Sequence, residues 1–200
     1  MSKRWVKERK RDGYYRKAKK AGYRSRSAYK LKQINERYKV ISPRDKVIDL
    51  GAAPGGWSQI AKEIVGPRGV VVGVDIQRIE PIEDVTFLRG DVAKPEILEE
   101  LSSIIIKADV IISDMSPNIT GNYSMDHARS IDLAEKALEI AKKFLKENGN
   151  FVVKVFQGDL FDGYFNEVKT KFKFTKAHSP SASRKQSSEI YVIGKGFLVR

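Results

Sequence analysis

The chain has 200 residues, 41% of them hydrophobic, which suits one domain with a substantial core. It has no cysteine, which excludes disulfides, thiolate metal sites and thiol nucleophiles and is typical of a cytoplasmic protein. No apolar run approaches the roughly 20 residues that a membrane span needs, and nothing in the basic N-terminus indicates a secretory signal.

The positive charge is concentrated in one part of the chain. The net charge is +13, yet residues 1–46 alone carry +14 and the remaining residues carry −1. Aromatic side chains that can stack on bases are interleaved with these cations: Trp5, Tyr14, Tyr15, Tyr23 and Tyr29. We therefore expect residues 1–23 to form a basic arm that binds nucleic acid, and residues 24–200 to form a single domain. The alternative is a solvated tail that only aids solubility.

The first helix of the domain is predicted over residues 27–38. Ser25 or Ser27 would cap it. Apolar residues then recur at helical spacing: Ala28, Leu31, Ile34 and Tyr38. Lys30 lies off this stripe, so we expect it to face away from the packing surface of the helix.

Strands and helices alternate along the rest of the chain. Seven strands are predicted, over residues 46–50, 69–75, 85–91, 108–114, 151–157, 173–179 and 189–197. Helices are predicted over residues 57–64, 95–103 and 159–170, and a long helix follows the polar loop 115–126 and is stopped by Gly149. The alternation predicts an α/β fold with a doubly wound, mostly parallel sheet. The last strand follows its predecessor without a helix, so we expect it to be antiparallel.

A glycine-containing loop, "DLGAAPGGWSQ", joins the first strand to its helix. Its spacing resembles the dinucleotide fingerprint, but Ala53 stands where the second glycine normally makes room for a pyrophosphate. Asp75 and Asp91 end the next two strands, where carboxylates can accept hydrogen bonds from a ribose diol and an adenine amino group. The pattern favours S-adenosylmethionine over a nicotinamide cofactor. Alternatively, the two carboxylates only form turns or cap helices.

A lysine in the middle of an apolar strand, Lys154 in "FVVKVFQ", is unexpected because burying an ammonium group is costly. Asp114 ends the neighbouring predicted strand, and Glu189 begins the antiparallel one. All three should therefore meet at the edge where such sheets bind ligands. A purely structural ion-pair network is the alternative. With two histidines in the chain, we expect no metal site.

The motifs together are similar to those of the FtsJ (RrmJ) heat-shock family of ribosomal RNA ribose 2′-O-methyltransferases. The matching stretches are "RSRSAYKL", "VIDLGAAPGGWSQ", "GVDI", "RGDV", "SDMSPN", "VVKVFQG" and "SRKQSSEIY". They run in order from about residue 24 to residue 193. The resemblance implies a Rossmann-like methyltransferase fold, S-adenosylmethionine as methyl donor, and a ribose in large-subunit ribosomal RNA, expected to be that of a uridine, as methyl acceptor.

The resemblance also assigns residues. The family's catalytic tetrad corresponds to Lys30, Asp114, Lys154 and Glu189. The cofactor site corresponds to Gly51, Ala53, Pro54, Gly55, Gly56, Trp57, Asp75, Asp91 and Asp114, although Trp57 could equally pack at the helix start. We expect Arg24, Arg26 and Lys32, beside Lys30, to bind RNA, and the enzyme to act as a monomer.

Ribose methylation needs removal of the 2′-hydroxyl proton as the carbon–oxygen bond forms. Lys154 is the candidate base, although it could instead steer the hydroxyl and stabilise developing negative charge. Three rival functions remain at this point: methylation of transfer RNA or messenger RNA caps, a catalytically silent RNA-binding scaffold, and a nicotinamide-dependent oxidoreductase. The complete tetrad argues against the scaffold, and Ala53 argues against the oxidoreductase.

Overall fold

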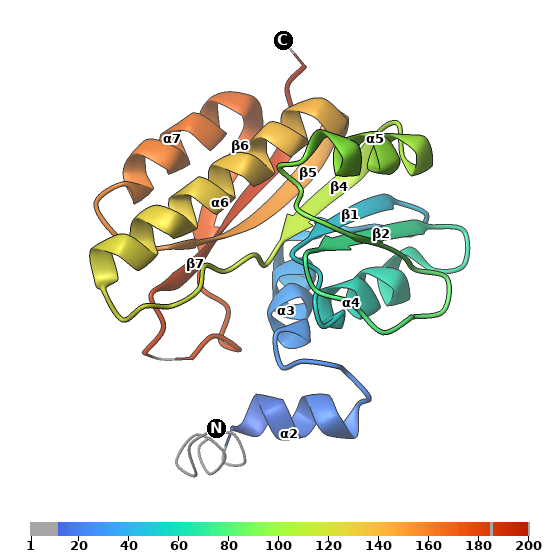
Figure 1. Cartoon of the computed structure of the whole chain (residues 1–200), viewed down its shortest axis with the longest axis horizontal. Coiled ribbons are helices and arrows are strands. Elements are labelled where there is room, and N and C mark those ends of the chain that lie inside the picture. The colour runs from blue at the N-terminus through green and yellow to red at the C-terminus, as the bar shows by residue number, and fades with distance from the viewer. Residues whose placement is uncertain (1–11, 185, 200) are drawn as a thin grey trace.

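Residues 12–184 and 186–199 are described by a computed structural model, in which helices cover both faces of a seven-stranded sheet (Figure 1). The strands are β1 (Lys46–Leu50), β2 (Val70–Asp75), β3 (Thr86–Arg89), β4 (Ala108–Ser113), β5 (Leu145–Phe156), β6 (Phe172–His178) and β7 (Glu189–Phe197). The helices are α2 (Gly13–Lys20), α3 (Ala28–Tyr38), α4 (Gly56–Val65), α5 (Pro95–Ile104), α6 (Tyr123–Phe144) and α7 (Phe161–Lys171).

The strand order is β3-β2-β1-β4-β5-β7-β6. Strands β1 to β5 pair in parallel, and β7 is antiparallel to both β5 and β6. The predicted fold class is therefore confirmed. The chain reverses its winding between β1 and β4, so the carboxyl ends of these strands form the edge at which a ligand site is expected.

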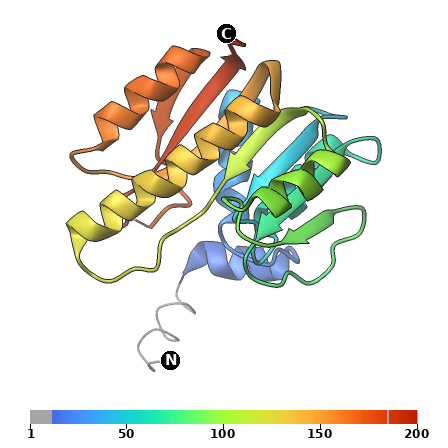
Figure 2. The same cartoon turned by 45° about the horizontal axis from the view of Figure 1, so that its top comes forward.

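Each face of the sheet has its own apolar core. Helices α5, α6 and α7 pack on one face, and α3 and α4 pack on the other, which the turned view in Figure 2 also shows. Neighbouring strand residues alternate between the two cores, as Val47 and Ile48 do in β1. Burial on both faces explains why the central strands are nearly continuous apolar runs.

The long helix ends earlier than the sequence predicted. Gly149 was expected to stop it, but α6 ends at Phe144 and Gly149 lies inside β5. The reason is that Leu145 already pairs with Ala108 of β4, so the strand ladder takes over before the glycine is reached. The helix also begins within the predicted loop, because the Asn122 side chain accepts a hydrogen bond from the Met125 N–H and caps it.

The described part of the basic N-terminal segment is a helix that lies against the domain. The Asp12 side chain caps the N-terminus of α2, and Ala18 of the same helix is buried against the domain. The Tyr14 ring contacts the Tyr29 ring at 5.6 Å, and its hydroxyl hydrogen-bonds Ser181. Trp5 and the rest of residues 1–11 lie outside the described residues. Across the described ranges, none of the helices is long and apolar enough to span a membrane.

Candidate active site

The four predicted catalytic side chains meet at the carboxyl edge of the sheet. Asp114 directly follows β4, and Lys154 lies in β5 beside it. In the antiparallel pairing of β5 with β7, Phe156 is opposite Glu189 at the end of the ladder. Lys30 comes from α3 and is buried despite its charge. The strand order predicted this meeting for Asp114, Lys154 and Glu189, and Lys30 joins them from α3.

The first ion pair joins Lys154 to Asp114. The Lys154 Nζ donates a hydrogen bond to the Asp114 backbone oxygen at 2.6 Å and lies 3.2 Å from Asp114 Oδ1. The lysine is buried. Both oxygens belong to Asp114, so the Lys154 nitrogen is held on one side and retains a direction for a third partner.

The second ion pair joins Lys30 to Glu189 at 2.5 Å, and both side chains are mostly buried. The Lys30 Nζ also lies 5.7 Å from the centre of the Tyr191 ring, within the range of a cation–π contact. Because breaking a buried pair leaves an uncompensated charge, each partner holds the other in place.

Tyr191 links the two pairs and was missed at the sequence level. Its hydroxyl donates to Asp114 Oδ1 at 2.8 Å, while its ring lies beneath Lys30. Burial and the neighbouring carboxylates Asp114 and Glu189 raise its pKa well above the ordinary value, so it remains a neutral donor. The signal was available: Tyr191 is two residues after Glu189 on a strand and therefore shares its face.

Asp114 is charged in spite of its surroundings. Burial alone would raise the pKa of its carboxyl, but the cations Lys154 and Lys30 and the Tyr191 hydroxyl together hold that pKa below its ordinary value. The cluster therefore contains a permanent carboxylate that orients an ammonium group. Such a cluster can position a hydroxyl, accept its proton, or stabilise an oxyanion.

A cavity of about 330 Å³ opens beside this cluster at the ends of β1, β2, β3 and β4. Five of the predicted cofactor residues line it: Gly51, Ala53, Asp75, Asp91 and Asp114. Asp114 therefore belongs to both the cavity and the catalytic cluster. The volume is at the lower end of the range of about 300–1,000 Å³ for small-molecule sites.

Gly51 shapes this cavity. Its φ is +72°, and a Cβ built on it would lie 2.5 Å from Met115 Cγ. A side chain at this position would therefore strain the backbone and displace the loop after β4.

The two strand-end carboxylates both line the cavity and organise its loops. Asp75 accepts hydrogen bonds from the backbone N–H groups of Ala53 at 2.9 Å and Gln77 at 2.8 Å. Asp91 accepts one from Ala93 N–H at 2.9 Å and is exposed to solvent. Both carboxylates therefore stabilise loops, and the same hydrogen bonds hold them at the wall of the cavity.

The second half of the glycine motif, residues 54–57, does not line the cavity. This half consists of Pro54, Gly55, Gly56 and Trp57. A Cβ on Gly56 would lie 2.2 Å from Ser25 Oγ. The Trp57 indole is buried, donates to the Ser27 backbone oxygen at 2.9 Å and packs on Tyr191. The Trp57 side chain therefore has the packing role that was the alternative to a cofactor contact.

The predicted RNA-binding residues differ in how they are held. The Arg24 guanidinium donates to three backbone oxygens, those of Pro54, Glu80 and Pro81. Arg26 pairs with Asp12 and donates to the Ala182 backbone oxygen. Lys32 is exposed. The two arginines therefore brace the N-terminal segment against the loops of the site, and Lys32 is the member of the predicted set that solvent reaches freely.

Asp49 in β1 is a second buried carboxylate that sequence reasoning missed. Its Oδ2 accepts a hydrogen bond from Ser58 Oγ at 2.6 Å, and its Oδ1 has no partner among the described residues. Burial raises its pKa to about 7, and the single serine hydrogen bond offsets this only partly. Within an apolar strand, nothing distinguishes such a residue until both faces are known to be covered.

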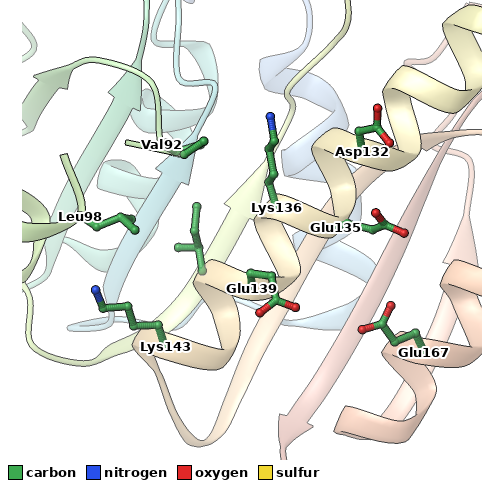
Figure 3. Close-up of a pocket in the computed structure, with 10 residues that line it drawn as sticks. Val92, Leu98, Asp132, Glu135, Lys136, Glu139, Lys143 and Glu167 are labelled. Carbon is green, nitrogen blue, oxygen red and sulfur yellow. The ribbon is translucent and has the colours of Figure 1, made fainter. Parts of the chain in front are cut away.

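A larger cavity, of about 780 Å³, lies over α6 between α5 and α7 (Figure 3). Lys136 and Val92 line both it and the smaller cavity. Its carboxylates belong to the helix surface, where Glu139 and Glu167 both pair with Lys142. Among the described residues no cluster of histidine, aspartate and glutamate is arranged to hold a metal ion, in this cavity or elsewhere.

The fold and the site together define a class of protein. A mostly parallel sheet with an antiparallel β7 carries a cavity at its switch point. A tight glycine turn and strand-end carboxylates line that cavity, and a lysine–carboxylate cluster stands at its mouth. This is the arrangement expected of a Rossmann-like methyltransferase.

Comparison with known proteins identifies the family. The model of FtsJ-like methyltransferases matches residues 23–197. The ribosomal RNA large subunit methyltransferase E of Methanothrix thermoacetophila is 56% identical and aligns with 94% of this chain and 73% of its own length. The protein of that name from Archaeoglobus fulgidus is 56% identical and aligns with 93% of this chain and 96% of its own length. A crystal structure of a Plasmodium falciparum ribosomal RNA methyltransferase superposes with a TM-score of 0.80 at 27% identity, covering 89% of this chain and 100% of that one.

The chain therefore belongs to the FtsJ-like methyltransferase family, as its motifs predicted. Enzymes of this type take their methyl group from S-adenosylmethionine.

Proposed function

We propose that this protein transfers the methyl group of S-adenosylmethionine to the ribose 2′-hydroxyl of a nucleotide, a uridine, in large-subunit ribosomal RNA. The observation that carries the proposal is the position of Asp114, which lines the cofactor cavity and also holds Lys154. A nucleophile bound to Lys154 would therefore face the methyl donor. The names of the relatives, ribosomal RNA large subunit methyltransferase E, support the choice of RNA.

Each side of the site has a distinct task in this proposal. Asp75 would accept hydrogen bonds from a ribose diol and Asp91 from an adenine amino group, with Asp114 near the methionine end. The cofactor supplies a methyl group on a sulfonium, which is already activated for transfer. The rate then depends on holding the ribose hydroxyl in line with that methyl and on removing its proton.

Lys154 is the residue proposed to accept that proton. In this step Lys154 acts as the neutral amine. Its two N–H groups would be donated to the two Asp114 oxygens, which leaves the nitrogen lone pair to take the proton of the 2′-hydroxyl and form an ammonium. Lys30 would stabilise negative charge on the ribose oxygen, while Glu189 orients Lys30. Asp114 stays ionised, as its lowered pKa requires for this orienting role.

RNA would be held by the cations at this edge of the molecule. Helix α2 presents exposed Arg16, Lys17, Lys19 and Lys20, and α3 presents Lys32. Phosphate contacts of this kind release counterions, so RNA binding should weaken steeply as salt is raised. Removal of residues 1–23 should reduce both RNA affinity and its salt dependence, and unchanged values would remove this segment from the proposal.

The test of the function uses radiolabelled methyl groups on S-adenosylmethionine. The protein is incubated separately with transfer RNA, free ribosomal RNA and large ribosomal subunits. We expect label in large-subunit RNA. Label confined to transfer RNA would contradict the proposed substrate, and cofactor binding without transfer to any RNA would favour a silent scaffold. Tight binding of a nicotinamide cofactor instead would contradict the reaction class.

We also propose that the enzyme acts as a monomer in the cytoplasm and needs no metal ion. Sedimentation should give the mass of one chain, 22.6 kDa. Activity should survive a chelator such as EDTA. A dimer whose partner completes the site, or loss of transfer on chelation that magnesium restores without affecting RNA structure, would contradict this part of the proposal.

A further inference from the structure

A third cavity, of about 260 Å³, lies at the same edge of the sheet and is not used by the proposed mechanism. Two loops that are far apart in the sequence form it together. Ile119 and Tyr123 come from the segment after β4 and the start of α6, and Ser187 and Ser188 come from the segment before β7. Its volume is below the range of typical small-molecule sites, so it suits a single flat ring better than a nucleotide cofactor.

The cavity adjoins the catalytic cluster through the β5–β7 ladder. Phe156, which lines the cavity, is opposite Glu189 in that ladder. The next pair of residues continues the connection, because Gln157 N–H donates to the Ser188 backbone oxygen at 2.8 Å. One wall of the cavity is therefore one residue away from Glu189. A ribose bound at Lys154 would therefore have this opening beside it, because Phe156 is two residues from Lys154 on β5.

Tyr123 offers a fixed aromatic surface at the opening. Tyr123 is 60% exposed, so its ring is accessible to a partner. The hydroxyl donates to the Gln157 backbone oxygen at 2.6 Å. The ring lies nearly parallel to the His127 ring, with 15° between the planes and 6.4 Å between the ring centres. A tyrosine tethered at its tip and aligned with a neighbouring ring is a preformed platform for stacking.

His127 is a wall of the cavity and not an acid or a base in it. Its Nδ1 lies 3.0 Å from the Phe156 backbone oxygen, which can only accept, and its Nε2 accepts from Leu160 N–H at 3.0 Å. Both nitrogens are thereby satisfied by the neutral ring with its proton on Nδ1. The histidine supports Tyr123 and ties α6 to the turn that follows β5.

The loop that carries Ile119 is also held in place. Asp126 accepts hydrogen bonds from Thr120 N–H at 2.9 Å, Thr120 Oγ1 at 2.8 Å and Gly121 N–H at 3.1 Å. These hydrogen bonds, chiefly those from Thr120, lower the pKa of the Asp126 carboxyl. Because the loop is ordered in advance, a ligand would not bear the cost of ordering it.

We infer that this cavity binds an unpaired RNA base, at or next to the methylated ribose, by stacking it on Tyr123. The inference rests on the proposed function for the presence of RNA at this edge. Its occupant follows from the lining: an aromatic platform, the apolar Ile119 and Phe156, and the serine hydroxyl groups of Ser187 and Ser188. Proteins that recognise single-stranded RNA stack splayed bases on aromatic rings and hydrogen-bond their edges in this manner.

The test measures RNA binding to wild-type protein and to Tyr123→Ala. The probe is a single-stranded oligonucleotide from the labelled region of the RNA, or a uridine-rich one if no methyl is transferred. A matched series lacks one base at a time, at the target position and at each neighbour. Phe174→Ala is the control, because Phe174 is 46% exposed but lies near the amino end of β6, away from this edge.

Tyr123→Ala should weaken binding of the intact RNA about 5- to 150-fold, the range for loss of one base–aromatic stack. The difference between variant and wild type should vanish for one RNA of the abasic series, and Phe174→Ala should bind as wild type does. Unchanged binding by Tyr123→Ala, or equal weakening with every abasic RNA, would overturn the inference. If Tyr123→Ala fails to fold, Tyr123→Leu, which keeps apolar volume without the ring, replaces it.

Methyl transfer measured in parallel separates this inference from the proposed function. Transfer without any base-dependent effect of Tyr123 would overturn the base site alone. A base-dependent effect on RNA that is never methylated would support the base site and contradict the proposed function.

Discussion

The cofactor cavity and the catalytic cluster share one edge of the sheet but are built in different ways. The cavity is made by loops that follow β1, β2, β3 and β4, and backbone N–H groups hold its carboxylates in place. The cluster is made of side chains from α3, β5, β7 and Asp114, the residue after β4, which hold one another through ion pairs. The difference suggests that damage to the two regions should be separable: one sets cofactor affinity and the other sets the rate of transfer.

The largest effect is expected in the cluster. Lys154→Met should lower kcat by about 10²- to 10⁴-fold, the usual contribution of a positioned general acid or base, while cofactor affinity stays within a few-fold. Lys142→Met is the control, because Lys142 is also ion-paired but lies on the α6 surface. If the Lys154 variant lost cofactor binding and transfer together, the two regions would not have separate roles. A pH–rate profile unchanged in shape by this substitution would leave Lys154 as a positioning group.

The next effect concerns the free energy of unfolding and its dependence on the protonation of Asp49 in β1. Asp49 has a pKa of about 7 in the folded protein, above the value of about 3.9 for a free aspartate. The stability that this group contributes is therefore complete below about pH 4 and is lost as the pH rises through about 7.

Asp49→Asn, which stays neutral, should thus gain stability relative to wild type across that interval, by up to about 4 kcal/mol, and the difference should be level above it. Urea unfolding at several pH values measures this. Asp132→Asn, on the exposed surface of α6, is the matched control. A difference that does not change between pH 4 and pH 8 would show that Asp49 is not a protonated buried group.

The third effect concerns the cavity, where a substitution should change both cofactor affinity and stability. Gly51→Ala should weaken cofactor binding and destabilise the fold, because a positive φ costs about 1–3 kcal/mol and the new Cβ would also meet Met115. Gly66→Ala has a similar φ of +70° but open space around it, so it should show the backbone cost alone. Calorimetric titration and thermal unfolding distinguish the two. Equal losses of stability in the two variants, with unchanged cofactor affinity, would mean that Met115 moves aside without cost.

The smallest effect is expected where the two ion pairs are linked. Tyr191→Phe keeps the ring beneath Lys30 but removes the hydrogen bond to Asp114, and should lower kcat about ten-fold with little change in cofactor affinity. Tyr164→Phe removes another buried tyrosine hydroxyl, which donates to the Ala134 backbone oxygen at 2.9 Å. That control should lose stability but keep its kcat. An unchanged kcat in Tyr191→Phe would show that Asp114 needs no help to stay oriented.

The same contrast explains what the sequence could predict. Topology alone was enough to bring Asp114, Lys154 and Glu189 to one edge, because strand order determines which strand ends meet. Position within a motif was a weaker guide: Gly51 and Ala53 of the glycine loop line the cavity, but Trp57, from the same motif at the start of α4, packs against Tyr191. That distinction depends on contacts with α3 that no local pattern encodes.

The remaining errors also come from partners distant in the sequence. Gly149 was a sound local stop signal, but pairing of Leu145 with Ala108 ended α6 first. RNA binding by Arg24 and Arg26 stays a prediction, but no local pattern indicated that backbone oxygens from three other loops engage both side chains. Local propensity is a weak prior, and tertiary pairing overrides it at such positions.

The central claim is that the cluster acts on a ribose hydroxyl and not on a base, and alkaline hydrolysis of the labelled RNA tests it most directly. Alkali cleaves RNA through the free 2′-hydroxyl, so a methylated ribose blocks cleavage at its own nucleotide. If the cluster acts on the ribose, the transferred label is recovered in an alkali-resistant dinucleotide. Recovery of the label in single nucleotides would place the methyl group on a base and contradict the account.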